Sequence, residues 1–148
     1  MENRLMTLHL NQEPFKDAIE ACAQNLRMNA LYIEKDYWVS YILKAISKSS
    51  YRDVAIFKGG TSLSKAYKLI ERFSEDIDLA VITNELNSNQ IKTLIRKIEK
   101  TILDANFEEI EIAHITSKGS EFRKTVHRYP KAQHGDFGHA NENIILEI

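Results

Sequence analysis

The chain has 148 residues, enough for one domain with a hydrophobic core. Its formal net charge of -1 excludes a chain-wide basic surface, so any contact with nucleic acid would need a local patch. A single cysteine, Cys22, excludes an internal disulfide and a cysteine-rich zinc site. The apolar helical pattern around Cys22 predicts that it is buried. No apolar run has the length of a signal peptide or a membrane span, which favours a cytoplasmic protein without a membrane partner.

Two helices are predicted in the first 50 residues. Apolar residues recur at spacings of three and four from Phe15 to Leu26, with Pro14 in the first turn and Asn25 and Asn29 as possible interruptions. A second helix is expected over 33–47. Its apolar face carries residues that we expect in the core rather than stacked on a base, namely Tyr37, Trp38, Tyr41, Ile42 and Ala45.

Shorter elements follow a polar break at 47–50. The expected order is strand 53–57, helix 62–72, strand 77–82, helix 89–104, strands 109–115 and 121–129, a polar loop 131–142 and strand 143–148. Helices followed by a mixed α and β region predict an α+β or α/β architecture, and of these we expect α+β. We expect residues 1–50 to form an N-terminal helical segment packed on a core of residues 51–148. The final hydrophobic strand either completes the sheet or belongs to a longer protein of which this chain is the first part.

The stretch FKGGTSLSK, residues 57–65, has the glycines, hydroxyls and lysines of a phosphate site. A P-loop requires G-x-x-x-x-G-K-[ST], because its lysine directly follows the last glycine. Here Ser64, which cannot supply glycine's backbone freedom, stands directly before Lys65 in the place of that last glycine. The motif therefore fails, and a kinase or ATPase of this type is not predicted.

Two aspartates follow within one helix length. Asp76 and Asp78 alternate with apolar residues, so on a strand their side chains share a face. Like charges that close repel each other, and a divalent cation such as Mg²⁺ removes the conflict. Taken alone, an Asp-x-Asp pair at a strand start is a common surface feature, and a Gly-Gly pair before a helix is commonly a plain turn.

The combined order is more specific than either part. A strand leads into GGTS at a helix N-terminus, where backbone N–H groups and the helix dipole attract phosphate. The helix then returns the chain to the strand that carries Asp76 and Asp78. A phosphate grip at Gly59, Gly60 and 61–62, with metal ligands nearby, fits the reach of one nucleotide.

The stretch KGGTSLSKAYKLIERFSEDIDLAV resembles the signature of the nucleotidyltransferase family that includes the AbiEii/AbiGii-type toxins, in the DNA polymerase β-like superfamily. The upstream EKDYWVSYILKAI resembles a helix that precedes the motif in this family. The resemblance implies a nucleotidyltransferase-like mixed β-sheet flanked by helices. Members of the family are generally longer, which favours the interpretation that the chain is the N-terminal part of a longer protein.

The resemblance also implies roles for individual residues. A third carboxylate on a later strand is expected beside Asp76 and Asp78, and Glu147 in NIILEI fits, although a strand-edge glutamate facing water is the alternative. Glu109 and Glu111 are instead expected on a solvent face. The residues expected to bind the nucleotide phosphates are Lys58, Gly59, Gly60, Thr61, Ser62 and Lys65.

The activity implied by the resemblance is transfer of a nucleoside monophosphate from an NTP to an acceptor hydroxyl, with Mg²⁺ or Mn²⁺ as cofactor. The acceptor would be tRNA or a protein. The protein would be the toxin of a bacterial toxin–antitoxin or phage-defence system, with a cognate antitoxin as partner. The alternatives are a non-catalytic or incomplete nucleotidyltransferase-like module that binds nucleotide, and a phosphotransferase that uses the same fold.

Overall fold

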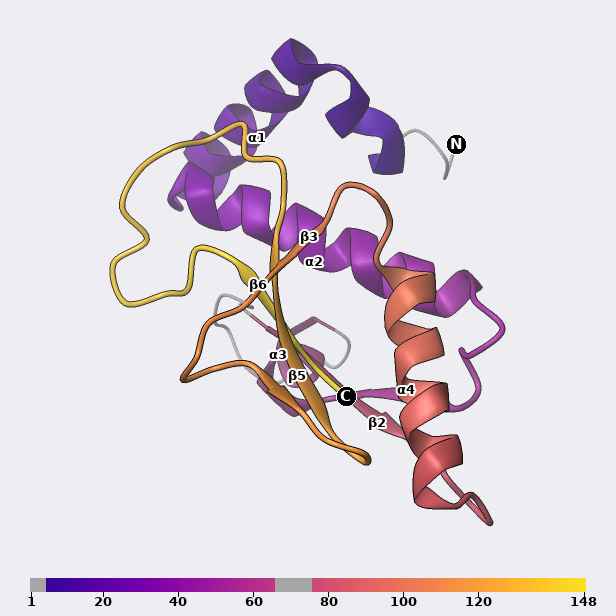
Figure 1. Cartoon of the computed structure of the whole chain (residues 1–148). Helices are drawn as coiled ribbons and strands as arrows, with labels where there is room; N and C mark the ends of the chain where they lie inside the picture. The colour runs from indigo at the N-terminus through magenta and orange to yellow at the C-terminus, as the bar shows by residue number, and fades with distance from the viewer. Residues whose placement is uncertain (1–4, 66–75) are drawn as a thin grey trace.

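The structure is a computed structural model of the chain, and it describes residues 5–65 and 76–148 (Figure 1). The helices are η1 (Leu5–Leu10), α1 (Gln12–Leu26), α2 (Ala30–Lys48), α3 (Gly59–Lys65) and α4 (Ser88–Ile102). The strands are β1 (Ala55–Lys58), β2 (Asp76–Val81), β3 (Glu108–Ile110), β4 (Ser117–Lys118), β5 (Arg123–Arg128) and β6 (Ile144–Glu147). The predicted helix 62–72 begins earlier, at Gly59, and its residues 66–72 lie outside the described residues.

The strands form one mixed sheet in the order β1-β2-β6-β5-β3, with β4 paired to β5. β2 and β6 run parallel, and the other pairs are antiparallel. The α+β class, with a mixed sheet and helices against it, is therefore confirmed. The last strand in the sequence, β6, lies inside the sheet beside β2, which brings the end of the chain to the Asp-x-Asp strand.

One face of the sheet packs against α2 and α4. Ile77 and Leu79 of β2 and Ile144 and Leu146 of β6 alternate with partly exposed residues and are buried. Burial on one face only gives the period of two that these strands show in the sequence. The helix residues that share this core are Trp38, Val39, Ile42, Ile46, Ile95, Ile98 and Ile102. Asp76, Asp78 and Glu147 consequently project from the opposite face.

Local capping explains the boundaries of the long helices. Arg27 has a left-handed backbone, with φ of 53°, and ends α1, while the Asn29 side chain accepts a hydrogen bond from Leu31 N at the start of α2. The interruption predicted at Asn29 is thus a true break, whereas Asn25 lies within α1. Asn87 and Gln90 form a reciprocal capping box that begins α4.

Two predictions from the sequence were wrong. Cys22 is exposed, because α1 buries only the stripe of Phe15, Ile19 and Ala23, and Cys22 lies beside that stripe. The strand expected at 109–115 ends at Ile110, because Ile115 N and Thr116 N both donate to the Ile112 carbonyl and close a turn. None of the helices in the described part of the chain has the length and apolar character needed to cross a membrane.

Candidate active site

Gly59 joins β1 directly to α3 and lies against Asp78 of the neighbouring strand β2. It follows Lys58, the last residue of β1, and α3 begins at Gly59 without an intervening loop. Its φ of +75° favours glycine, and a Cβ added there would lie 2.2 Å from Asp78 Oδ2. The absence of a side chain at Gly59 therefore allows the Asp78 carboxylate to lie against the start of α3.

Strand register places four charged residues in a row across the sheet. Lys58 of β1 is opposite Asp78 of β2, Asp78 is opposite Glu147 of β6, and Glu147 is opposite Lys124 of β5. Residues paired in this way have their side chains on the same face. We call Lys58, Asp78, Glu147 and Lys124 the charged row.

The ends of the charged row contact Glu147. Lys58 Nζ lies 3.6 Å from Glu147 Oε1, and Lys124 Nζ lies 3.6 Å from Glu147 Oε2. The Glu147 side chain is 27% exposed and belongs to an interior strand, so it is not a strand-edge glutamate in water. The structure thus brings Glu147, Asp78, Lys58 and Gly59 together, as the family resemblance implied.

Thr61 and Ser62 lie in the first turn of α3 and are buried. Thr61 Oγ1 donates a hydrogen bond of 2.6 Å to the carbonyl oxygen of Asp76. This bond ties the start of α3 to the start of β2, so the Thr61 hydroxyl has an architectural role here. Phosphate binding by Gly60, Thr61 and Ser62 stays a prediction.

Lys65 is held by α2. Its Nζ lies 2.7 Å from Asp36 Oδ1 and donates to Ser40 Oγ at 2.8 Å, and the side chain is mostly buried. A phosphate group would have to replace Asp36 as the partner of this ammonium. The role of Lys65 in phosphate binding stays a prediction as well.

The donor chemistry of this face fits a hard divalent cation. Asp76 and Asp78 share a face of β2, and Glu147 lies beside Asp78 on the neighbouring parallel strand. Mg²⁺ prefers such carboxylate oxygens together with substrate phosphates and water. Within the described ranges 5–65 and 76–148, no group of three or more His, Cys, Asp or Glu side chains is close enough to hold a metal ion.

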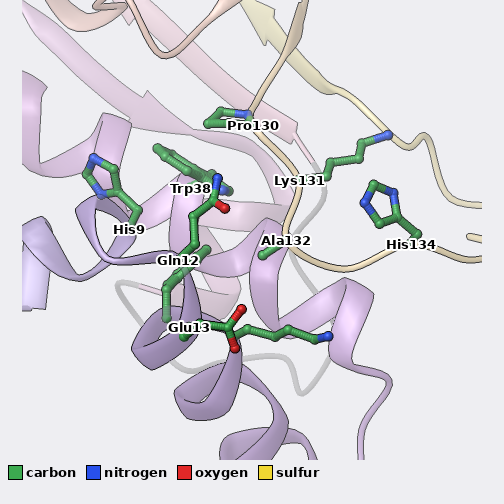
Figure 2. A pocket seen from close by; sticks show the side chains of 10 residues that line it. His9, Gln12, Glu13, Trp38, Pro130, Lys131, Ala132 and His134 are labelled. Carbon is green, nitrogen blue, oxygen red and sulfur yellow. The ribbon is translucent and has the colours of Figure 1, made fainter.

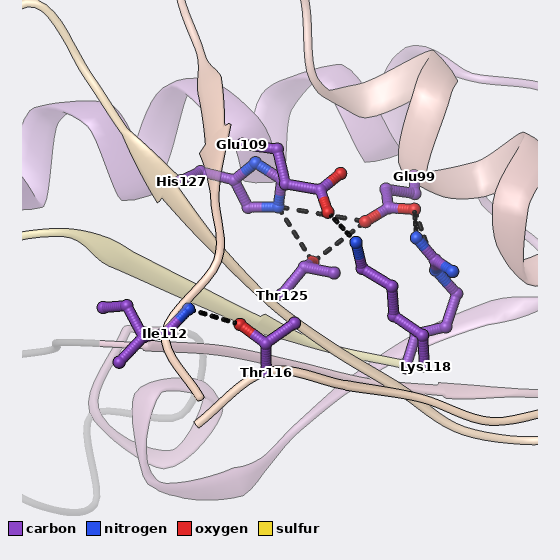
Figure 3. A network of polar contacts seen from close by, with 8 residues as sticks. Glu99, Glu109, Ile112, Thr116, Lys118, Thr125 and His127 are labelled. Carbon is purple, nitrogen blue, oxygen red and sulfur yellow. Dashed lines mark hydrogen bonds and ion pairs between the residues drawn. The ribbon is translucent and has the colours of Figure 1, made fainter. Parts of the chain in front are cut away.

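A second polar cluster lies between α4 and β5 (Figure 3). Arg123 forms an ion pair with Glu99 in which Nη2 lies 2.7 Å and Nε 2.9 Å from Oε2. Thr125 Oγ1 donates to Glu99 Oε1 at 2.9 Å, so the 2.8 Å contact between Thr125 Oγ1 and His127 Nε2 requires His127 to donate. Burial lowers the pKa of His127, although the nearby carboxylates of Glu99 and Glu109 act in the opposite direction. We call Glu99, Arg123, Thr125 and His127 the α4–β5 cluster.

Sequence reasoning missed the α4–β5 cluster. Alternating polar residues on a strand are typical of a solvent face. The burial of the polar side chains of β5 becomes visible only through their contacts with Glu99 of α4. A cavity of about 550 Å³ opens beside the cluster. Its lining residues include Arg96, Lys100, Phe107, Glu109 and Lys118.

Another cavity, of about 260 Å³, lies at the N-terminal helices (Figure 2). His9, Glu13 and Trp38 line one side, and residues 130–132 with His134 line the other. None of the residues predicted to bind metal or nucleotide lines this cavity. It is instead a contact region between α1, α2 and the connection that leads from β5 to β6.

A comparison with protein families identifies the class to which this α+β chain belongs. A family model described as "Nucleotidyl transferase AbiEii toxin, Type IV TA system" matches residues 41–148, well over half of the chain. The chain belongs to this AbiEii nucleotidyl transferase family of type IV toxin–antitoxin systems. Comparisons with curated proteins and with solved structures gave no match.

Proposed function

We propose that the protein transfers a nucleoside monophosphate from an NTP to an acceptor hydroxyl, on tRNA or on a protein, in a divalent-metal-dependent reaction. The observation that carries this proposal is the strand register that aligns Glu147 with Asp78, with Lys58 and Gly59 on the other side. Acidic side chains from two neighbouring strands thereby meet a helix start that suits a phosphate. Family membership supports the same class of reaction.

Asp76, Asp78 and Glu147 would hold Mg²⁺ or Mn²⁺ on the face of the sheet opposite α2 and α4. The ion would neutralise charge on the phosphates and on the attacking and leaving oxygens. Backbone N–H groups at Gly59 and Gly60 would contact the β- and γ-phosphates, with Lys58 balancing their charge.

The reaction forms a bond between the acceptor oxygen and the α-phosphorus and breaks the bond to the bridging oxygen, so pyrophosphate leaves. Glu147 would accept the proton of the hydroxyl. In a type IV system the protein would be the toxin, and this reaction would be its toxic activity in the cytoplasm. Its role would be in a toxin–antitoxin or phage-defence system. A cognate antitoxin would be its partner.

The position of the label in the NTP tests the reaction. The chain is incubated with Mg²⁺, tRNA or total protein, and each NTP labelled at either the α- or the γ-phosphate. We expect covalent label in the acceptor from the α-labelled NTP alone, and none with the Asp76→Asn/Asp78→Asn double variant. Transfer of the γ-label alone would identify a phosphotransferase. No transfer with any NTP would favour a module that only binds nucleotide.

A further inference from the structure

Residues 130–143, in the connection between β5 and β6, form neither helix nor strand but are fixed to α2 at several points. In Figure 1 this connection leaves β5, passes beside the N-terminal helices and returns to β6. Tyr32 Oη donates to the Phe137 carbonyl at 3.0 Å. A Cβ added to Gly135 would lie 3.1 Å from Leu31 Cδ1, so the backbone passes close to the helix there.

Glu34 of α2 holds the beginning of this connection. Its side chain is buried, and its two carboxylate oxygens accept hydrogen bonds from consecutive backbone amides, Ala132 N at 2.6 Å and Gln133 N at 2.8 Å. Both oxygens act as acceptors, which favours the ionised carboxylate because it offers lone pairs on both. Burial raises the pKa of Glu34, and the two amides oppose that shift.

Lys35, the next residue, holds the end of the connection. It is fully buried, and its Nζ donates to the Asn141 carbonyl at 2.6 Å. Asn141 Oδ1 in turn accepts from Asn143 N at 2.8 Å, directly before β6 begins at Ile144. The chain segment that leads to Glu147 is therefore anchored by a buried ammonium.

The same part of α2 also holds α3. Asp36 and Ser40 bind Lys65, and they follow directly on the stretch 31–35 of α2 that contacts the β5–β6 connection. One helical segment thus joins the glycine half of the candidate site to the Glu147 half. Burying charged groups is costly unless each is hydrogen-bonded, so simple packing would be served better by apolar residues.

We propose that Glu34 and Lys35 are positioning residues of the candidate active site, which anchor the 130–143 connection on α2 and so keep Glu147 aligned with Asp78. The effect of these residues on reaction rate rests on the proposed nucleotidyl transfer. Their structural effect, restraint of β6, does not depend on catalysis.

The test compares Glu34→Gln and Lys35→Met with matched controls in the full chain. Glu142→Gln removes an acid of the same connection that pairs with Lys131 and not with α2. Lys48→Met removes an exposed lysine from the other end of α2. Thermal unfolding first establishes that each variant is folded.

Amide hydrogen exchange of the nucleotide-free protein gives the first measurement. We expect Ala132 and Gln133 to be protected in the wild type, and Glu34→Gln to accelerate exchange there and in β6. Lys35→Met should accelerate exchange in β6, and both controls should match the wild type. Unprotected Ala132 and Gln133 amides in the wild type overturn the proposal even when no variant folds. Unchanged β6 exchange in folded variants overturns it as well.

Transfer kinetics gives the second measurement. For Glu34→Gln and Lys35→Met we expect kcat to fall about 10- to 100-fold, the range typical of groups that orient metal ligands. KM for the NTP should change little, while half-maximal activity should need more Mg²⁺. Kinetics equal to those of the controls would overturn the proposal. If the wild type transfers no nucleotide, the proposed function fails, and the exchange data alone decide the positioning role.

Discussion

At the scale of single residues, Gly59 is the position where backbone conformation and site geometry depend most directly on each other. We predict that Gly59→Ala destabilises the fold by about 1–2 kcal/mol, the cost of a left-handed backbone for a residue with a Cβ. The new Cβ would also push the Asp78 carboxylate away, because only 2.2 Å separates them. We therefore expect transfer activity to fall by on the order of 100-fold, as for a displaced catalytic group. Urea unfolding and initial rates measure the two effects.

Gly138→Ala is the matched control. Gly138 has a similar φ of +61°, but an added Cβ would have no heavy atom within 4 Å. We expect a comparable loss of stability with unchanged activity. Equal losses of activity in both variants would show that the contact between Gly59 and Asp78 has no catalytic consequence.

At the scale of secondary-structure elements, the ion pair between Glu99 and Arg123 joins α4 to β5. Both side chains are more than 90% buried. We predict that Arg123→Met lowers the free energy of unfolding by about 3–5 kcal/mol, because it leaves the Glu99 charge buried without its cation. The Glu99→Gln/Arg123→Met double variant should recover most of this loss, since it removes the charge and keeps an acceptor for Thr125. Chemical denaturation in a double-mutant cycle measures both, and strictly additive losses would contradict the account.

His127 gives the same cluster a pH dependence. Burial holds its pKa in the folded state below the ordinary value of 6.5, so below that pH the unfolded chain binds the proton first. The free energy of unfolding should consequently decrease as the pH falls from about 6.5 toward the folded-state pKa. His127→Gln should remove this part of the slope, measured as the difference between wild type and variant across pH 5 to 7. Parallel pH profiles would show that His127 does not titrate as its burial implies.

The elements also show how far the sequence could be interpreted alone. The order of strand, Gly-Gly, helix and Asp-x-Asp was predictable, because glycine pairs, helical spacing and alternation are local signals. The pairing of β6 with β2 is a long-range contact, and only the family resemblance pointed to Glu147. The α4–β5 cluster and the burial of Glu34 and Lys35 were not predicted, since charged residues are usually exposed.

At the scale of the whole molecule, α2 belongs to the core of the sheet. Trp38, Val39 and Ile42 are fully buried against β2, β6 and α4. The division into a helical segment of residues 1–50 and a core of residues 51–148 therefore remains a prediction that truncation can test. We expect a chain of residues 51–148 to lack a cooperative thermal transition, because it would expose the apolar face that α2 covers.

Removal of residues 1–28 is the comparison for that truncation. It deletes η1 and α1, whose Phe15 packs on Tyr37 and Trp38, and leaves α2 intact. For the chain without residues 1–28 we expect a cooperative thermal transition at a lower temperature than in the full chain. Circular dichroism measures this transition. A cooperative transition in residues 51–148 alone would establish an independent core and contradict the expectation.

We propose above that the carboxylates of Asp76, Asp78 and Glu147 form a metal-dependent nucleotide site. Isothermal titration calorimetry of the chain with each NTP, with and without Mg²⁺, tests it most directly. We predict NTP binding by the wild type that requires Mg²⁺ and is lost in Asp78→Asn, while the Gly138→Ala control binds normally. NTP binding that is the same without Mg²⁺, or that persists unchanged in Asp78→Asn, would contradict the claim.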